Sequence, residues 1–491
     1  MTGRYSTRTG VWHTILGRSL MDPEEETLAE IFQANGYRTG HFGKWHLGDN
    51  YPLRPQDQGF EHVVWHHGGG VGQGPDYWDN DYFDDTYEVN GEWRPFEGYC
   101  TDVWFEEALR FIEREDDRPF FAYLATNAPH GPFLVDESYS EPYVEAGVPA
   151  TMARFYGMIT NIDENVGRLR RRLAELGLDE NTVLIFTTDN GTAAGNAPRK
   201  DEEGTWPGFD GGMRGKKGSE YEGGHRVPFF VHWPGGGLTG GRDMSRLAAH
   251  IDVLPTLMSW CDLERRGTRA LDGRSFGEPG TQEERIRFVH SQRIEHPEKW
   301  RKCAVMDGRW RLVNGVELYD LESDPRQVRD IAADHPDRVA RLRAEYEAWW
   351  TSLEPVMDDY VRIVVGAEEN PSRIMSHDWH ATQGGVPWHQ NHVRNGHVAN
   401  GTWMLEVARA GVYEVTLRRW PEVLERSMGM VHASVSIRGR EAEQELGPET
   451  TEARFRLDLT SGPTELVTTL RRPDGTEHGA YFVDIEFMGG R

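Results

Sequence analysis

The loop Gly43-Lys44-Trp45-His46-Leu47-Gly48 carries a lysine and a histidine two positions apart, bracketed by glycines. Residues 37–42, directly before it, have the composition of a β-strand, and residues 24–36 predict a helix with glutamates at its amino end and one apolar face. The order helix, strand, polar loop indicates an α/β fold. In that fold the end of a strand presents a fixed cation and a titratable base side by side.

The alternation of helices and strands continues along the chain. Buried strands are predicted at residues 119–124, 182–186 and 227–231, and helices at residues 101–114, 152–176 and 247–258. Strands that alternate with helices predict a parallel or mixed sheet. Ligands of such sheets bind beyond the carboxyl ends of the strands.

Polar motifs accompany these strands. Pro129-His130-Gly131-Pro132 follows the first strand, and Thr188-Asp189-Asn190-Gly191 follows the second. Gly215-Lys216-Lys217-Gly218 and Glu222-Gly223-Gly224 lie in the loop before the third. Cations, imidazoles and an Asp-Asn pair are the groups that a divalent cation and a tetrahedral oxyanion require. We therefore expect one convergent site at this edge of the sheet.

Composition narrows the range of partners. The formal net charge of −26 argues against nucleic acid and against anionic membranes as partners, so an anion site must be a local cationic focus. Lysine is rare, and two of the few lysines, Lys44 and Lys217, fall inside the motifs. An ammonium group on a flexible stem suits close approach to a crowded oxyanion.

The cysteines and the apolar segments exclude several classes of protein. Cys100, Cys261 and Cys303 are far apart and form no Cys-x-x-Cys pair, which excludes a disulfide scaffold and a zinc ribbon. No apolar run reaches the length of a membrane span, and the first thirty residues show no signal-peptide pattern.

The carboxyl-terminal part has a different pattern. Short strands and a helix near residues 336–350 predict a small α+β subdomain, and period-two alternation after residue 375 predicts a separate β-sandwich. We expect an α/β core over residues 1–284, the small antiparallel subdomain over 285–360 and the sandwich over 375–491. The predicted fold class is thus α/β, with a mixed, mainly parallel sheet flanked by helices, a small antiparallel carboxyl-terminal subdomain and a separate β-sandwich.

The order of these motifs along the chain and the residues within them, together with Leu271-Asp272-Gly273, resemble those of the type I sulfatases of the alkaline-phosphatase superfamily. The resemblance extends over about residues 1–350. The resemblance implies an alkaline-phosphatase-like core. It also implies hydrolysis of a sulfate ester through a formylglycine nucleophile and a calcium ion. The substrate would be a sulfated small molecule or glycan, and a periplasmic or secreted location is consistent with the family.

The resemblance also implies roles for individual residues. Asp189 and Asn190 match the pair that binds calcium, and hard oxygen ligands suit Ca²⁺ better than zinc, with Mg²⁺ the less favoured choice. Lys44 matches the lysine that contacts the sulfate and the nucleophile. His46 matches the imidazole that takes a proton from the hydrated formylglycine.

The remaining two positions concern the sulfate and the leaving oxygen. His130 and Lys217 match the residues that hold the sulfate and assist the leaving oxygen. Lys216 is adjacent, but the spacing to Glu222-Gly223-Gly224 favours Lys217. The resemblance thus supplies a cationic cradle and two imidazoles for proton transfer.

The chain departs from the family at its amino end. Met1-Thr2-Gly3-Arg4-Tyr5 resembles the tail of the sulfatase signature, but no Cys or Ser stands in the C/S-x-P-S-R context that gives formylglycine. The only Pro-Ser-Arg, Pro371-Ser372-Arg373, lies in the wrong part of the chain. Two metal-binding aspartates and the first core strand have no counterpart either. We interpret this as a late start or a fragment, and expect no appreciable activity from the chain as given.

Two other functions compete with this interpretation. A phosphatase or phosphodiesterase of the same superfamily would use Thr or Ser and a two-metal His/Asp set, which the single Asp-Asn pair does not favour. A non-catalytic carbohydrate-binding protein would combine an inactive sulfatase shell with the sandwich.

Two aromatic regions could also take part in binding. Residues 76–85 are acidic and aromatic, and we expect a solvated insertion loop there more than a substrate mouth or a cation site. Trp379-His380 and Trp388-His389 could face a sugar or a metal, but an interdomain seam is the favoured interpretation. In the sandwich, Trp403, Trp420 and Tyr481 are expected to be buried rather than to stack on sugars.

Overall fold

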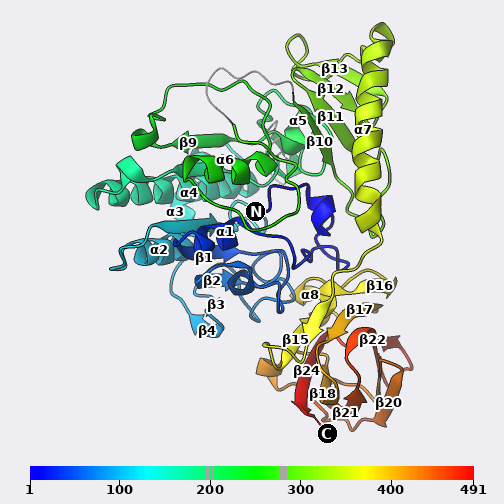
Figure 1. Ribbon diagram of the computed structural model, residues 1–491. Coiled ribbons are helices and arrows are strands. Elements are labelled where there is room, and N and C mark those ends of the chain that lie inside the picture. The colour runs from blue at the N-terminus through cyan, green and yellow to red at the C-terminus, as the bar shows by residue number, and fades with distance from the viewer. Residues whose placement is uncertain (195–198, 202–203, 207, 277–284, 491) are drawn as a thin grey trace.

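The computed structural model describes residues 1–194, 199–201, 204–206, 208–276 and 285–490. Three parts follow one another along the chain (Figure 1): an α/β part, a small antiparallel sheet backed by one long helix, and a β-sandwich at the carboxyl end. This architecture confirms the predicted fold class. None of the described helices is both long and apolar enough to cross a membrane.

The main sheet of the α/β part has the order β4-β3-β2-β1-β5. Its strands are β1 (Arg38–Lys44), β2 (His62–His66), β3 (Thr86–Val89), β4 (Glu92–Pro95) and β5 (Phe120–Ala125). The central strand β1 pairs in parallel with β2 and with β5, whereas β2·β3 and β3·β4 are antiparallel. The sheet is therefore mixed, and its parallel strands carry the polar loops at one edge.

Two further pairs of strands are separate from this sheet. β6 (Leu184–Thr187) pairs with β9 (Phe229–His232), and β7 (Arg199–Asp201) pairs with β8 (Gly204–Trp206), both antiparallel. The third predicted strand therefore runs antiparallel to its neighbour β6. β5 and β6 are not hydrogen-bonded, but both contribute alternate side chains to the same two core clusters.

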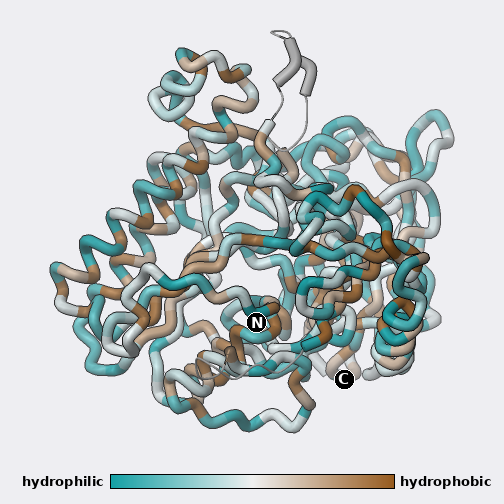
Figure 2. The backbone as a smooth tube through the Cα atoms, turned by 90° about the horizontal axis from the view of Figure 1, so that it is seen from above, coloured by the Kyte–Doolittle hydropathy of each residue, from teal (hydrophilic) through white to brown (hydrophobic). Residues whose placement is uncertain are grey.

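Helices cover both faces of these strands. They are α1 (Leu28–Ala34), α2 (Cys100–Ile112), α3 (Glu137–Glu145), α4 (Ala150–Glu175), α5 (Glu222–His225) and α6 (Val253–Trp260). α2 and α4 pack on one side, around Trp104, Phe111 and Met158. α1 and α6 pack on the other, where the ring of Phe32 stacks on Phe121 at 4.5 Å. In Figure 2 hydrophobic stretches run through the interior, and the outer helical turns alternate between hydrophilic and hydrophobic residues, as amphipathic helices do.

Helix α1 begins later than the sequence predicted. Thr27 forms a capping box with Glu30: the Glu30 N–H donates to Thr27 Oγ1 at 3.1 Å, and the Thr27 N–H donates to Glu30 Oε2 at 2.7 Å. This reciprocal pair satisfies two amide groups at the helix start. The preceding glutamates therefore lie before the helix and not in its first turn.

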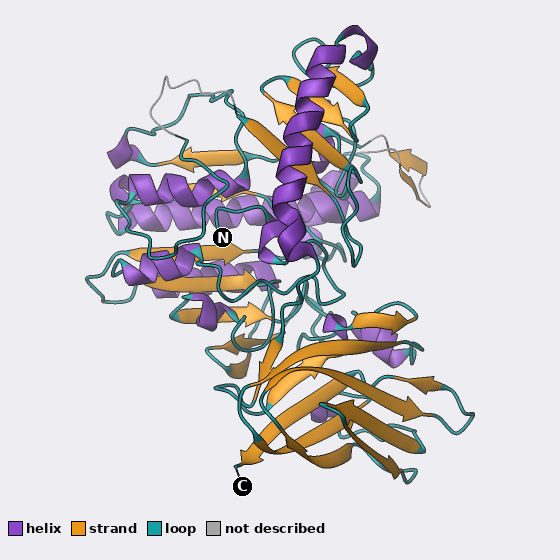
Figure 3. Ribbon diagram, turned by 45° about the vertical axis from the view of Figure 1, so that its right-hand side comes forward, coloured by secondary structure: helices purple, strands orange, loops and turns teal. Residues whose placement is uncertain are grey.

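The small subdomain is an antiparallel sheet covered by a helix. Its strands follow the order β10 (Ile286–His290), β11 (Cys303–Asp307), β12 (Trp310–Val313) and β13 (Glu317–Asp320). α7 (Pro336–Met357) lies along this sheet and buries Leu342 and Tyr346 against it (Figure 3). Short 3₁₀ helices occur at Ser6–Thr9, Pro55–Gln58, Asp179–Asn181, Pro234–Gly236, His250–Asp252, Ala332–Asp334, Ser376–Asp378 and Glu422–Leu424.

The carboxyl-terminal part is a sandwich of two sheets. One sheet has the order β14-β17-β22-β19-β20 with β16 and β23 at its margins, and the other has the order β15-β24-β18-β21. The strands are β14 (Ile363–Val365), β15 (Ser372–Met375), β16 (His380–Gln383), β17 (Asn400–Val407), β18 (Gly411–Arg418), β19 (His432–Ile437), β20 (Arg440–Glu445), β21 (Ala453–Leu459), β22 (Gly462–Arg471), β23 (Glu477–His478) and β24 (Phe482–Gly489), and α8 (Gln390–Arg394) lies between β16 and β17. Trp403 and Tyr481 are buried between the sheets, as expected.

The sandwich packs directly against loops of the α/β part. Leu20, Leu53 and Trp78 belong to the same hydrophobic cluster as the sandwich core. The side-chain amide of Asn50 donates to the backbone oxygen of Arg373 at 2.9 Å. The seam therefore runs close to the loop that follows β1. Of the predicted pair Trp379-His380, His380 lies at the seam, with its Nδ1 2.8 Å from Glu295 Oε1, whereas Trp379 is fully buried against Trp403 inside the sandwich.

Candidate active site

The first two candidate residues stand at the carboxyl end of the central strand. Lys44 is the last residue of β1, and His46 follows it in the loop. Gly43 has a φ of 108° and lies so close to the backbone oxygen of Ala125 that a side chain would collide with it. Glycine is therefore required where β1 meets β5, and the strand delivers both polar side chains beyond this contact.

The other candidates come from loops around neighbouring strands. His130 lies beyond the end of β5, where its N–H donates to the Asn127 oxygen at 2.8 Å. Asp189 and Asn190 lie beyond the end of β6. Lys217 belongs to the loop before α5, and its backbone N–H donates to the oxygen of Thr192 at 2.9 Å. Lys216 is exposed, whereas Lys217 is partly buried.

Glycines explain why the last two motifs occur together. The Gly191 N–H donates to the Gly224 oxygen at 3.0 Å, and a side chain at Gly191 would overlap the backbone of Gly223. The Asp-Asn-Gly and Glu-Gly-Gly segments thus pass each other in direct backbone contact. This contact brings Lys217 to the side of Asp189.

The charges of these residues influence one another. Burial lowers the pKa of Lys44, the Asp189 carboxylate opposes this, and the Lys217 ammonium adds to it. The pKa of His130 is lowered first by partial burial and then by Lys217 and Lys44, with Asp189 again opposing. These four side chains therefore lie within range of each other's charge, and Asn190 adjoins them in sequence.

His46 is held as a neutral base. Its Nε2 donates to the backbone oxygen of Thr14 at 2.9 Å, which leaves Nδ1 without a proton. Burial lowers the pKa of His46 well below its ordinary value, and the charges of Lys44 and His377 lower it further. Gly69 lies against the imidazole ring, where a side chain would not fit. The ring is thus fixed in place with Nδ1 able to accept a proton.

His130 has the opposite orientation of its nitrogens. Its Nδ1 donates to the backbone oxygen of Gly131 at 2.7 Å, so the neutral ring presents Nε2 as an acceptor. Once Nε2 takes up a proton, the ring can donate it to a departing oxygen. The two imidazoles therefore have their free acceptor on different nitrogens, and both lie within range of the Lys44 charge.

One neighbour of the site was not predicted from the sequence. His377, in the 3₁₀ helix Ser376–Asp378 of the sandwich, lies beside His46. The histidine-rich character of this segment was visible, but no pattern indicated which loop it would contact. The sandwich thus contributes one side chain to the surroundings of His46.

The oxygen donors of Asp189 and Asn190 are the kind that calcium binds. The Asp189 side chain is exposed, and within the described residues it forms no hydrogen bond or ion pair that would occupy it. No group of three or more His, Cys, Asp or Glu side chains in the described part of the chain could hold a metal ion. These two residues therefore fit part of a calcium shell, which takes about six to eight oxygens.

Other motif residues hold the fold together. Glu222 is buried, and its Oε1 accepts from Arg311 Nε at 2.6 Å, which joins α5 to β12. Asp272 accepts from the Tyr5 N–H and from Arg8 Nε, both at 3.0 Å. The segment Leu271-Asp272-Gly273 therefore holds the first residues of the chain in place and contributes no group to the candidate site.

The acidic and aromatic segment 76–85 is solvated only in part: Asp79, Asp81 and Asp84 are exposed, as expected, but two other aspartates are not. Asp76 and Asp85 are buried and not solvated. Asp76 accepts from the Gly72 N–H at 2.8 Å, and Asp85 accepts from the N–H of Tyr82 at 2.9 Å. These carboxylates satisfy backbone amides inside a compact loop, so the prediction of a solvated insertion was wrong for both.

The chain is similar in sequence to known sulfatases. The sulfatase family model matches residues 1–263. The uncharacterized sulfatase YdeN of Escherichia coli K12 is 26% identical over 426 residues, covering 73% of this chain and 72% of that protein. Human arylsulfatase A is 31% identical over 284 residues, covering 52% of each chain, and pig N-acetylgalactosamine-6-sulfatase is 30% identical over 300 residues, covering 56% of this chain and 54% of that protein.

A solved structure shows the same similarity. Ps i-CgsB, determined in complex with k-i-k-neocarrahexaose, is 25% identical with a TM-score of 0.60, covering 71% of this chain and 80% of that one. The chain spans about half the length of the N-acetylgalactosamine-6-sulfatases and of arylsulfatase A. Because the family model covers more than half of the 491 residues, the chain belongs to the sulfatase family.

Proposed function

We propose that the protein is a sulfuric ester hydrolase whose site binds the sulfate group between Lys44, Lys217 and His130. The mutual influence of these side chains at the ends of neighbouring strands carries this proposal. In a chain of net charge −26, these two ammonium groups form a local cationic focus that suits an anion. Sulfate-ester cleavage spreads negative charge over several oxygens in its transition state, and fixed cations stabilise that charge.

The two imidazoles divide the proton transfers. His46 accepts a proton at Nδ1 from the attacking group, because its Nε2 proton is committed to the Thr14 oxygen. His130 binds near the leaving oxygen and donates to it once Nε2 is protonated, which the nearby Asp189 carboxylate favours. The lysines hold the sulfate in place during both transfers.

Asp189 and Asn190 would hold a calcium ion, in preference to magnesium, with oxygen ligands from further groups. When bound, calcium would supply Lewis-acid stabilisation of the sulfate oxygens. The formylglycine of the family has no counterpart among residues 1–491. The Ser372 side chain of the only Pro-Ser-Arg is fully buried in β15. We therefore expect residues 1–491 alone to bind sulfate esters without turning them over.

The substrate class is a sulfated small molecule or a sulfated glycan. Relatives named for N-acetylgalactosamine-6-sulfate hydrolysis and the Ps i-CgsB complex with k-i-k-neocarrahexaose support a carbohydrate. Similarity to a protein named arylsulfatase A supports simpler, aryl sulfate esters as a second possible kind of substrate.

Binding and turnover of 4-nitrophenyl sulfate test both parts of the proposal. Purified 1–491 is expected to bind the ester in a calorimetric titration, and Lys44→Ala is expected to weaken binding about tenfold because a charge-assisted contact is lost. No release of 4-nitrophenol is expected. The absence of binding would overturn the function, and release that Lys44→Ala abolishes would overturn the claim that this chain is inactive.

A further inference from the structure

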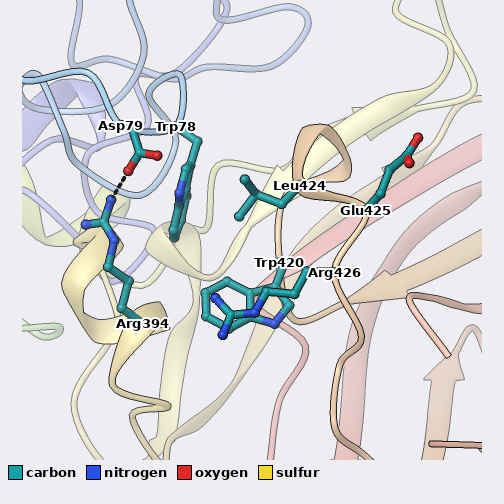
Figure 4. A pocket seen from close by; sticks show the side chains of 7 residues that line it. All are labelled: Trp78, Asp79, Arg394, Trp420, Leu424, Glu425 and Arg426. Atoms are coloured by element: carbon teal, nitrogen blue, oxygen red, sulfur yellow. Dashed lines mark hydrogen bonds and ion pairs between the residues drawn. The ribbon is translucent and has the colours of Figure 1, made fainter. Parts of the chain in front are cut away.

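A pocket of about 620 Å³ lies at the seam between the α/β part and the sandwich (Figure 4). We call it the seam pocket. It is lined by residues from the loop after β2, from α8 and from the segment after β18, namely Trp78, Asp79, Arg394, Trp420, Leu424, Glu425 and Arg426. The volume is in the range that holds a small ligand or one to two sugar rings.

Two tryptophans form a rigid base for the seam pocket. Trp78 and Trp420 meet edge to face, with ring centroids 5.9 Å apart and planes at 84°. They are only 9% and 4% exposed, so both rings are fixed by their surroundings and offer edges more than faces. The partly buried side chain of Leu424 adds a further apolar surface. The apolar face of a sugar can rest on Leu424, the least buried of these three side chains.

Three arginines lie over these rings, and one of them, Arg419, has its Cζ 4.8 Å from the centre of the Trp420 ring. Arg394 has its Cζ 4.6 Å from the centre of the Trp78 ring, and Arg426 has its Cζ 4.2 Å from the centre of the Trp420 ring. Arg394 also forms an ion pair with Asp79 across the seam. The aromatic rings orient the guanidinium groups without neutralising them.

Arg426 differs from Arg394 in its charge balance. Within the described residues its guanidinium forms no ion pair and no hydrogen bond, and the Glu425 carboxylate beside it has none either. Figure 4 shows Arg426 lying along Trp420, while Glu425 points away from the other lining residues. The seam pocket therefore contains an exposed arginine whose planar donors remain available to an anion.

One loop connects this pocket with the candidate active site. Gly69 lies against the ring of His46, Gly74 donates its N–H to the Trp388 oxygen at 2.9 Å, and Trp78 enters the seam pocket a few residues later. A ligand in the seam pocket would therefore contact the same loop that borders His46.

We propose that the seam pocket binds a sulfated sugar unit of a glycan, with Arg426 contacting its sulfate group and Leu424 contacting its ring. The identity of the ligand rests on the proposed sulfatase function, whereas the existence of the site rests on the lining residues. Sulfate and guanidinium pair through two parallel hydrogen bonds, which a neutral hydroxyl cannot reproduce. The pocket would thus select glycan substrates over simple esters.

Calorimetric titration with a sulfated carrageenan hexasaccharide and with its desulfated counterpart tests this proposal. We expect Arg426→Gln to weaken binding of the sulfated hexasaccharide about tenfold. The matched control is Arg440→Gln, which replaces an exposed arginine on β20 outside the pocket and is expected to leave the affinity unchanged. Because Arg426 is exposed, its replacement is not expected to impair folding.

Different variants test the seam pocket and the candidate active site independently. Arg426→Gln is expected to leave the affinity for 4-nitrophenyl sulfate unchanged, whereas Lys44→Ala is expected to reduce it. Equal binding of the desulfated hexasaccharide, or an Arg426→Gln affinity equal to that of the unaltered chain, would overturn the seam-pocket proposal and leave the proposed sulfatase function intact. A failure to bind 4-nitrophenyl sulfate, with binding of the hexasaccharide still dependent on Arg426, would overturn the proposed sulfatase function and leave the seam-pocket site intact.

Discussion

His46 and His377 have ring centroids 5.6 Å apart and planes inclined by 40°, although one follows β1 and the other belongs to the sandwich. His377 is 2% exposed, its Nδ1 lies 3.1 Å from Asp378 Oδ1, and its Nε2 has no hydrogen-bond partner among the described residues. Burial lowers the pKa of His377, but the carboxylates of Asp378 and Asp49 raise it overall. The surroundings therefore favour the charged form of His377 beside the ring of His46.

Replacing His377 is expected to raise the pKa of His46. The variant His377→Gln removes a positive neighbour, so protonation of His46 becomes less costly, although burial and Lys44 still keep its pKa low. The pKa can be followed by NMR of labelled histidine side chains across a pH titration. His432→Gln, on β19 of the sandwich, serves as the control and should leave His46 unchanged. An unchanged or lower pKa in His377→Gln would contradict this account.

The loop that borders His46 is tied down by an ion pair that should make stability depend on pH. His67 Nε2 lies 2.7 Å from Glu88 Oε2. Burial disfavours the charged form of Glu88, but His67 more than offsets this, and the pKa of Glu88 is lowered to about 2. A lowered carboxyl pKa stabilises the fold above the ordinary value of about 4.5, and the stabilisation is lost as pH falls toward 2.

Glu88→Gln should remove this acid dependence. The shift corresponds to about 3 kcal/mol of unfolding free energy near neutral pH, so the variant should be less stable there and should lose less between pH 5 and 2. Urea unfolding at several pH values measures the effect, with Glu106→Gln on the exposed face of α2 as control. Parallel pH profiles for Glu88→Gln and the unaltered chain would show that the pair contributes nothing.

The contact between Glu222 and Arg311 should be far more important for stability than an ion pair at the surface. Both side chains are nearly buried, at 3% and 7% exposure, so Glu222→Gln leaves a buried guanidinium without its counter-charge. A loss of about 3 kcal/mol is expected. Glu92→Gln, which removes the exposed partner of Arg94, should cost less than about 1 kcal/mol. Urea unfolding compares the two variants, and equal losses would contradict the structural role assigned to Glu222.

Much of the fold could be predicted because its hydrophobic patterns are regular. The period-two alternation after residue 375 corresponds to the strands of the sandwich, among them β17 and β18. The strands β3 and β4 were missed because they are short and β4 is largely exposed, so that neither shows a clear apolar period. The antiparallel pairing of β9 with β6 depends on the path of the intervening loop, which local patterns do not encode.

The candidate site could be predicted only in part. Motifs at strand ends indicated Lys44, His46, His130 and Asp189, because the ends of neighbouring strands meet at one edge of a sheet. The position of His377 follows from how the sandwich packs on the α/β part, and no spacing in the sequence reports that contact. The burial of Asp76 likewise follows from backbone amides that fold around it, which charge alone did not suggest.

The central claim is that Lys217, and not its neighbour, belongs to a sulfate-ester site. Calorimetric titration of 4-nitrophenyl sulfate into residues 1–491, Lys217→Ala and Lys216→Ala tests it most directly, since the two lysines are adjacent but only Lys216 is exposed. We predict an affinity about tenfold lower for Lys217→Ala and nearly unchanged for Lys216→Ala. Equal losses in both variants, or no loss in Lys217→Ala, would contradict the proposed site.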